Sequence, residues 1–544
     1  MTDNTDMIPP EGEANPIDTD YQIGQDNIKM NIGPFGLDIH NRVFLISGLV
    51  IVAFVFLTLA FQDSVGPMFQ AQLSWLYTNF DWFFLLSGNI FVLVCVLLVL
   101  SPLGKVRLGG TEATPDYSYT GWFAMLFAAG MGIGLMFYGV SEPMSHFQSA
   151  LGGTSMADGG QMRSDWSPLG AAAGDAEAAA KLGMSAAIYH WSLHPWAIYA
   201  ILALALALFS YNKGLPLTVR SIFYPILGER IWGWPGHIID ILAVFSTIFG
   251  LATSLGLGSA QAAAGLNALF DIPLGSTTQV ILVLGITSVA LISVVAGLDK
   301  GVKRLSEINM GLAILLLLFV VLVGPTLAII TGFFGDLWHY AKNFTALSMP
   351  FAREDSNFSQ GWTSFYWAWW ISWSPFVGMF IARVSRGRTV REFLICVLLI
   401  PSLVCAFWMS AFGGTAIHQF INDGYSAVAE AGLDLRLFEM LAALPLSEIT
   451  SFIAIILIIV FFVTSSDSGS LVIDTITAGG KMEAPTAQRV FWASFEGLLA
   501  IALILGGGLA ALQAMAVSTG LPFTLVLLVG CYTLYKGLMS EPRS

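Results

Sequence analysis

The amino-acid sequence predicts an all-α polytopic membrane protein that crosses the bilayer twelve times. Its 544 residues are 56% hydrophobic and only 11% charged, whereas soluble domains carry about 25% charged residues. Apolar runs recur along almost the whole chain, and each is close to the roughly 20 residues that cross a bilayer as a helix. Lysines and arginines gather in alternate connecting segments, which is typical of a chain that crosses a membrane repeatedly.

The membrane domain is expected to occupy residues 41–537, between two polar ends. Residues 1–40 carry seven acidic residues in their first 30 against one basic residue, Lys29, and this composition is typical of a disordered tail. Residues 538–544 form a short C-terminal end. Between these ends, apolar segments predict helices over residues 44–61, 83–103, 120–141, 185–210, 237–263, 278–297, 309–333, 363–383, 393–414, 449–475, 490–512 and 518–537.

The positive charges predict which side of the membrane holds the two termini. Of the 23 lysines and arginines, 18 fall in the connecting segments that share a side with the termini. The other side holds only Arg163, Lys181, Lys342, Arg353 and Arg436. Because segments rich in Lys and Arg stay in the cytoplasm, both termini are expected to be cytoplasmic.

Two of the expected spans contain residues that interrupt a helix. The third carries GMGIG (130–134), where each glycine costs about 1 kcal/mol relative to alanine, although glycine also serves close helix packing. The eighth carries SWSP (372–375), whose proline removes a helical hydrogen bond. Each of these spans opens a run of five, one travelling outward and the other inward. This pattern predicts an inverted-repeat secondary transporter, with repeats over about 120–333 and 363–537 after two extra helices.

Aromatic residues gather beside these interruptions. The two clusters consist of Trp369, Trp370 and Trp373 in the eighth span and Trp191, Trp196 and Tyr199 in the fourth. Tryptophan and tyrosine also form belts at membrane interfaces, which is the alternative interpretation. The tryptophans of the eighth span lie near its middle, however, and this position favours a patch that binds a ligand.

A cage of indole faces suits one ligand chemistry above others. A quaternary ammonium has no N–H to donate, so it is held by cation–π attraction, worth about 2 kcal/mol per ring when desolvated. The backbone N–H groups of Met131, Gly132 and Gly134 at the glycine break are available to a carboxylate of the same ligand. The sequence therefore predicts a site for a methylated zwitterion, meaning a betaine or a sulfonium analogue.

The energy source is expected to be an ion gradient. The chain has no Gly-x4-Gly-Lys-Ser/Thr motif, so ATP is not expected to drive it. The tenth span carries VTSSDSGS (463–470), and hydroxyls that face the carbonyls of a broken helix make a site for a hard cation such as sodium, although single hydroxyls usually bond their own helical turn. Asp467 in this motif is a structural acceptor or, alternatively, a proton carrier. His190 and His194 lie four residues apart on one expected helix, a spacing that allows two metal ligands, but no third ligand is evident in the sequence.

Four segments resemble the betaine/choline/carnitine transporter (BCCT) family, and the resemblance extends from about residue 40 to 537. They are GMGIGLMFYGVSEP (130–143), HWSLHPWAIYA (190–200), YWAWWISWSPFVGMFIARVSRGRTVREF (366–393) and VTSSDSGS (463–470). The resemblance implies a LeuT-like 5+5 inverted repeat of helices 3–7 and 8–12, commonly assembled as a homotrimer. It also implies a non-enzymatic, sodium-coupled transporter of the glycine betaine type with no cofactor besides the coupling ions.

The resemblance further implies roles for individual residues. The substrate cage would consist of Trp191, Trp196, Tyr199, Trp369, Trp370 and Trp373, and Phe380 matches an aromatic of the cytoplasmic-side pathway. The first sodium site would use the backbone of Ala128, Met131 and Phe461 with the hydroxyls of Thr464 and Ser465. A second sodium site would use Thr247 and Phe376. The sequence departs from the family pattern at Leu251, where a second threonine is expected one turn after Thr247.

Gly134 stands where choline- or carnitine-type relatives often carry another residue, including Asp. A small uncharged residue suits a ligand that brings its own carboxylate, and this favours glycine betaine or dimethylsulfoniopropionate over choline. Three alternatives stay open: a proton-coupled choline importer using Asp467, a sodium-independent carnitine-type exchanger, and a non-transporting receptor or channel. Neither interrupted span contains the Lys or Arg that an exchanger would use in place of sodium. The short C-terminal end lacks the long basic tail of osmosensing relatives, so constitutive activity is expected.

Overall fold

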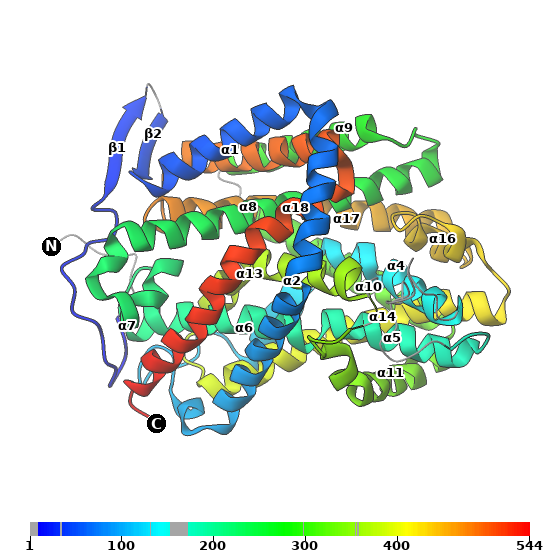
Figure 1. Ribbon diagram of the computed structural model, residues 1–544, viewed down its shortest axis with the longest axis horizontal. Coiled ribbons are helices and arrows are strands. Elements are labelled where there is room, and N and C mark those ends of the chain that lie inside the picture. The colour runs from blue at the N-terminus through cyan, green and yellow to red at the C-terminus, as the bar shows by residue number, and fades with distance from the viewer. Residues whose placement is uncertain are drawn as a thin grey trace.

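The computed structural model describes residues 9–32, 35–130, 132–152, 172–296, 299–353, 355 and 358–543. Within these residues the chain is mostly helical. Figure 1 shows long helices packed side by side, with an N-terminal hairpin at one end and both termini at that same end.

The hairpin consists of β1 (Asn27–Ile32) and β2 (Phe35–His40), which pair antiparallel. The helices of the first half are α1 (Val43–Ala60), α2 (Gln62–Leu100), α3 (Tyr119–Gly130), α4 (Ile133–Gly152), α5 (Ala176–Trp191), α6 (Leu193–Ala207), α7 (Tyr224–Leu227), α8 (Trp234–Phe270), α9 (Ser276–Ala296), α10 (Asp299–Val323) and α11 (Thr326–Ser348). Those of the second half are α13 (Ser364–Val384), α14 (Val390–Asn422), α15 (Ala427–Glu430), α16 (Arg436–Ala442), α17 (Ser447–Thr477) and α18 (Thr486–Met539).

Many of the helices have the length and hydropathy of membrane-spanning segments. Among the described residues, nine helices are long and apolar enough to span a bilayer, or ten if α3 and α4 form one bent span. α13 lies outside that count although it covers the predicted eighth span. α18 covers both the eleventh and the twelfth predicted spans, and its backbone leaves the helical conformation at Gly507 and Gly508. Gly508 has a φ of 60°, in the left-handed region that favours glycine.

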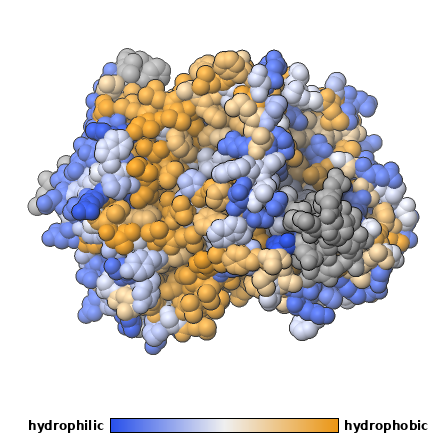
Figure 2. All heavy atoms as spheres, in the orientation of Figure 1, coloured by the Kyte–Doolittle hydropathy of each residue, from blue (hydrophilic) through white to orange (hydrophobic). Residues whose placement is uncertain are grey.

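The surface has the polarity of a protein embedded in a bilayer. Figure 2 shows hydrophobic residues in a broad band across the middle of one face, with hydrophilic residues at the end that carries both termini. Large apolar side chains such as Leu49 of α1, Leu100 of α2 and Leu322 of α10 are exposed. An exposed apolar surface of this extent is stable where lipid covers it.

The third and fourth predicted spans are both interrupted. α3 and α4 lie at 63° to one another on either side of the glycine motif, which confirms the predicted break; Met131, between them, lies outside the described residues. The fourth span divides into α5 and α6 at Ser192, whose φ and ψ are −106° and −122°. Pro195 accounts for this second break, because it has no N–H to bond the carbonyl of Trp191 four residues earlier.

The predicted break of the eighth span at Ser372–Pro375 is wrong, because α13 is one continuous helix from Ser364 to Val384. Pro375 removes the backbone hydrogen bond to the carbonyl of Ile371. The hydroxyl of Ser374 donates to that same carbonyl at 2.7 Å, so the carbonyl stays satisfied and the helix continues. The irregular turn lies instead before α13, where Ser359–Thr363 form a π-helix.

Part of the predicted disordered tail has a defined structure. Besides the hairpin, Glu11 pairs with Arg386 at 2.6 Å, and Asp38 pairs with Lys481. The side-chain amide of Asn27 donates to the carbonyl of Ala478 at 2.8 Å. Composition showed that this segment is acidic, but it did not show that basic residues at the same end of the molecule bind it.

Candidate functional site

A cavity of about 850 Å³ lies between the two halves of the chain. Its walls come from α3, α4, α5, α6, α8, α10, α13, α14 and α17. The predicted site residues that line it are Ala128, Gly132, Gly134, Trp191, Trp196, Tyr199, Trp369, Trp370, Trp373, Phe376, Phe380, Phe461, Thr464 and Ser465. Thr247 is not among the lining residues, and Met131 lies outside the described part of the chain.

Five of the six cage residues form a connected group of rings in this cavity, whereas the sixth, Trp373, lines the cavity in contact with the ring of Phe376. Trp370 lies at the centre of the connected group, with its ring centroid 4.8 Å from that of Trp191, 6.0 Å from that of Tyr199 and 5.2 Å from that of Trp369. The contacts with Trp191 and Tyr199 are edge-to-face, with interplanar angles of 84°, a geometry that aromatic pairs prefer. α6 and α13 pack against each other, and this packing brings the fourth-span and eighth-span clusters together.

The polar edges of three indoles are bonded to protein atoms rather than left free for a ligand. Trp370 Nε1 donates to the carbonyl of His190 at 3.1 Å, and Trp373 Nε1 donates to the carbonyl of Gly250 at 3.0 Å. Trp191 Nε1 donates to a carboxylate oxygen of Glu142 at 2.7 Å. An indole has only this one donor. These three rings therefore offer π surface to the cavity, which is suited to a cation without N–H groups.

Two glycines of the break face different surroundings. A Cβ atom on Gly134 would lie 2.6 Å from Cη2 of Trp191 and 3.3 Å from Cη2 of Trp369, whereas a Cβ on Gly132 would meet nothing within 4 Å. Gly134 is therefore required for the close approach of two cage rings to the backbone. From the sequence, the small uncharged residue at position 134 was explained by a ligand that brings its own carboxylate. The structure adds a steric reason, the close approach of Trp191 and Trp369.

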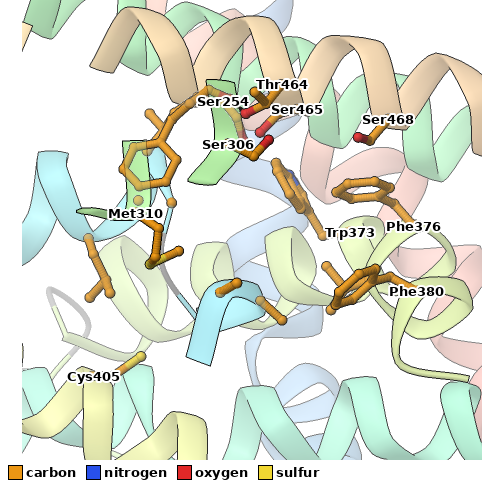
Figure 3. Close-up of a pocket in the computed structure, with 18 of the residues that line it drawn as sticks. Ser254, Ser306, Met310, Trp373, Phe376, Phe380, Cys405, Thr464, Ser465 and Ser468 are labelled. Atoms are coloured by element: carbon orange, nitrogen blue, oxygen red, sulfur yellow. Dashed lines mark hydrogen bonds between the residues drawn. The ribbon is translucent and has the colours of Figure 1, made fainter. Parts of the chain in front are cut away.

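Hydroxyl groups line another wall of the cavity. In Figure 3, Thr464, Ser465 and Ser468 extend from one helix, and Trp373, Phe376 and Phe380 come from another. Thr464 Oγ1 donates to the carbonyls of Val460 and Phe461 at 3.0 and 3.1 Å. This back-bonding uses the hydrogen of the hydroxyl and leaves its oxygen lone pairs available to a cation.

Of the two residues predicted for a second sodium site, Phe376 lines the cavity and Thr247 does not. Thr247 is buried and donates to the carbonyl of Ala243 at 2.7 Å. Phe376 lines the cavity beside Trp373, with ring centroids 5.4 Å apart. At the position of the missing threonine, the side chain of Leu251 packs against Gly469 of α17.

Charged residues outside the cavity clarify two open questions from the sequence. Asp467 pairs with Arg489 at 2.9 Å, which favours its structural interpretation. His194 Nε2 lies 2.9 Å from Asn89 Oδ1. His190 instead contacts Glu142, a buried residue that the sequence interpretation did not single out. The available signal was an acidic residue directly after the predicted third span (120–141), within the motif GMGIGLMFYGVSEP.

Comparisons with known proteins were made on the whole chain. A family model described as BCCT, the betaine/carnitine/choline family of transporters, matches residues 42–543. A glycine betaine/proline/choline transporter of Vibrio parahaemolyticus is 70% identical over 543 residues, which cover 100% of this chain and 98% of the relative. Glycine betaine transporter 1 of the same species is 51% identical, covering 96% and 97% of the two chains. A glycine betaine transporter of Acinetobacter baylyi is 41% identical, covering 92% and 74%.

Proposed function

The chain belongs to the BCCT family of transporters, and we propose that it imports a methylated onium zwitterion, glycine betaine or dimethylsulfoniopropionate, by sodium symport and alternating access. A multi-pass transporter of this family moves a small betaine- or choline-type solute across the membrane. The choice of solute and of coupling ion is our proposal.

The observation that carries the proposal is the arrangement of the cage indoles. Trp191, Trp370 and Trp373 line one cavity while their N–H groups are bonded elsewhere. A ligand there meets ring faces and edges and finds few donors among these rings. Permanent onium cations are selected by such a surface because cation–π attraction does not require an N–H on the ligand. We assign the carboxylate of the zwitterion to the backbone N–H groups of Gly132 and Gly134, beside the α3–α4 break.

Sodium coupling is supported by the hydroxyl groups of Thr464, Ser465 and Ser468, which line the same cavity as the rings. The first site would combine backbone carbonyls of Ala128, Met131 and Phe461 with the hydroxyls of Thr464 and Ser465. Hard cations prefer several oxygen ligands of this kind. A sodium ion moved with a net-neutral zwitterion carries one charge, so a membrane potential of 100 mV contributes about 2.3 kcal/mol per ion.

We further propose the topology that the family implies. Twelve spans result if α3 and α4 form the third, α13 the eighth, and α18 is divided at Gly507–Gly508. The repeats are then helices 3–7 and 8–12, with both termini in the cytoplasm of a bacterial inner membrane and a homotrimeric assembly. Phe380, near the end of α13, lines the cavity and is 36% exposed, consistent with a path to the cytoplasmic side.

Uptake into proteoliposomes tests the proposal. Purified protein is reconstituted into vesicles that contain potassium, valinomycin sets an inside-negative potential, and labelled glycine betaine is offered in a potassium-free external buffer of either sodium or N-methylglucamine. We expect accumulation above equilibrium only with an inward sodium gradient. Accumulation that follows a pH gradient and collapses with a protonophore would instead support the proton-coupled alternative. Binding without accumulation would support a receptor or channel.

Choline is the second candidate solute, because a relative with 70% identity is named for glycine betaine, proline and choline. The same vesicles distinguish the candidates when unlabelled choline, proline and dimethylsulfoniopropionate compete with labelled glycine betaine. We expect dimethylsulfoniopropionate to compete at lower concentrations than choline.

A further inference from the structure

A buried carboxylate lies directly behind the substrate cage. Glu142 of α4 is 0% exposed. Its Oε2 accepts hydrogen bonds from Trp191 Nε1 at 2.7 Å and from the hydroxyl of Tyr366 at 2.6 Å. Its Oε1 lies 2.5 Å from His190 Nδ1 and 3.2 Å from His146 Nε2. One side chain thus holds four groups from three helices, and one of them is a ring of the cage.

The hydrogen-bond partners indicate the charge of this cluster. An indole N–H only donates, so Oε2 is an acceptor. His190 donates from Nδ1, and its Nε2 lies 2.9 Å from the hydroxyl of Thr363, which donates either to this nitrogen or to the more distant carbonyl of Phe358 at 3.3 Å. With both histidines neutral and Glu142 ionised, all four bonds form, and the cluster carries one net negative charge.

The two arginines near the cluster, Arg436 and Arg353, donate hydrogen bonds to acceptors other than Glu142. Arg436 donates to the carbonyl of Ser141 and to the side chains of Ser145 and Gln148. Arg353 forms two bonds with Asp355 at 3.1 and 2.7 Å. No ion pair between Glu142 and an arginine or lysine occurs among the described residues.

The same three residues have the composition of a metal site, because Glu142, His146 and His190 place ligand atoms within 4.8 Å of one another. The geometry favours a hydrogen bond instead. Two ligands that each lie about 2.0 Å from a tetrahedral ion are separated by more than 3 Å, whereas His190 Nδ1 and Glu142 Oε1 are in direct contact at 2.5 Å.

We propose that Glu142 is a specificity-determining residue that makes the cage prefer a cationic head group over a neutral one of the same shape. The inference rests on the proposed function and assigns a role to a residue outside the cavity lining. The carboxylate polarises the indole of Trp191 through its N–H, which strengthens the negative potential of the ring, and its own charge attracts the ligand cation across that ring.

The size of the effect follows from the geometry. A cation on the far side of the indole is on the order of 10 Å from the carboxylate, and at an effective dielectric constant of about 20 this attraction corresponds to a factor of about tenfold in binding. A neutral head group gains no such factor. The cluster also positions a second ring, since the carbonyl of His190 accepts from Trp370 Nε1.

The test compares glycine betaine with its carbon isostere, 3,3-dimethylbutanoate, in wild type and in Glu142→Gln. Glutamine keeps the shape of the cluster, because its oxygen accepts from Trp191 and Tyr366 while its NH2 donates to the two imidazoles in their other tautomers. Dissociation constants come from calorimetry in detergent. We expect the wild-type preference for glycine betaine over the isostere to fall about tenfold in Glu142→Gln, mainly through weaker glycine betaine binding.

Two further variants keep the result interpretable. Tyr366→Phe removes one donor but keeps the charge, so its preference is expected to stay near that of wild type. If Glu142→Gln does not fold, Trp191→Phe serves instead, because it keeps an aromatic ring but removes the hydrogen bond to Glu142. This variant is expected to reduce the preference for glycine betaine over 3,3-dimethylbutanoate. An unchanged preference in Glu142→Gln, or an equal loss for both ligands, would overturn the role of Glu142 while leaving the proposed function standing. Failure of the wild type to bind glycine betaine would overturn the proposed function itself.

Discussion

Gly134→Ala is the sharpest test of the substrate cage. The added Cβ would lie 2.6 Å from Cη2 of Trp191, and real Cβ atoms essentially never approach this closely. The backbone of Gly134 is compatible with alanine, since it has no positive φ, so the effect is one of packing. Trp191 cannot simply withdraw, because it is 3% exposed and its N–H is bonded to Glu142.

The magnitude of the loss can be worked from one ring. A displaced Trp191 removes one cation–π contact, about 2 kcal/mol in a desolvated site, which corresponds to roughly a 30-fold higher Kd for glycine betaine. Calorimetric titration in detergent measures this change. Gly152→Ala at the end of α4 is the control, because Gly152 is not among the lining residues of the cavity and its Cβ would meet nothing within 4 Å. The reasoning is refuted if Gly134→Ala binds like wild type, or if both variants lose affinity equally.

Three other predictions concern a ring of the substrate cage, the proposed sodium site and the proline-containing helix α13. Trp373→Ala removes a cage ring and is expected to abolish measurable uptake in proteoliposomes; an unchanged affinity would count against the cage. Thr464→Ala is expected to raise the sodium concentration for half-maximal uptake several-fold, whereas Thr247→Ala, away from the cavity, should leave that curve in place; the reverse pattern would move the ion site. Ser374→Ala leaves the carbonyl of Ile371 without a partner and is expected to lower stability by about 1–3 kcal/mol, read as a lower Tm, and an unchanged Tm would show that α13 does not depend on that bond.

Much of the architecture could be predicted from the sequence, because hydropathy and glycine clusters act locally. Apolar runs located the helices, and the glycines of 130–134 located the break between α3 and α4. The eighth span was misjudged for an equally local reason: a proline signals a lost hydrogen bond, but Ser374, one residue before it, supplies the replacement. A rule that considers proline alone does not include the hydrogen bond from the neighbouring Ser374 to the carbonyl of Ile371. The Ser-Pro pair itself is present in the sequence.

The candidate site was less predictable where it depends on contacts between distant segments. The aromatic clusters were found from their spacing, and the structure places them around one cavity. Glu142 was overlooked because its role depends on His190 and Tyr366, which are 48 and 224 residues away. The sodium role of Thr247 came from the family resemblance and stays a prediction; in the structure its hydroxyl donates to the carbonyl of Ala243.

The break between α3 and α4 explains how substrate and ion would be coupled in the proposed mechanism. Gly134 packs against the rings of Trp191 and Trp369, while Ala128 and Gly132 line the same cavity as Thr464 and Ser465. In the proposed mechanism, a ligand among the rings would contact α4 at Gly134, and a cation near Thr464 and Ser465 would contact α3 at Ala128, so both ligands would lie beside the break that joins these helices. If each binds best to the same conformation of this break, sodium must raise the affinity for the solute by the factor by which the solute raises the affinity for sodium. Symport then requires no direct contact between the two ligands, only a shared stretch of backbone that both hold in place.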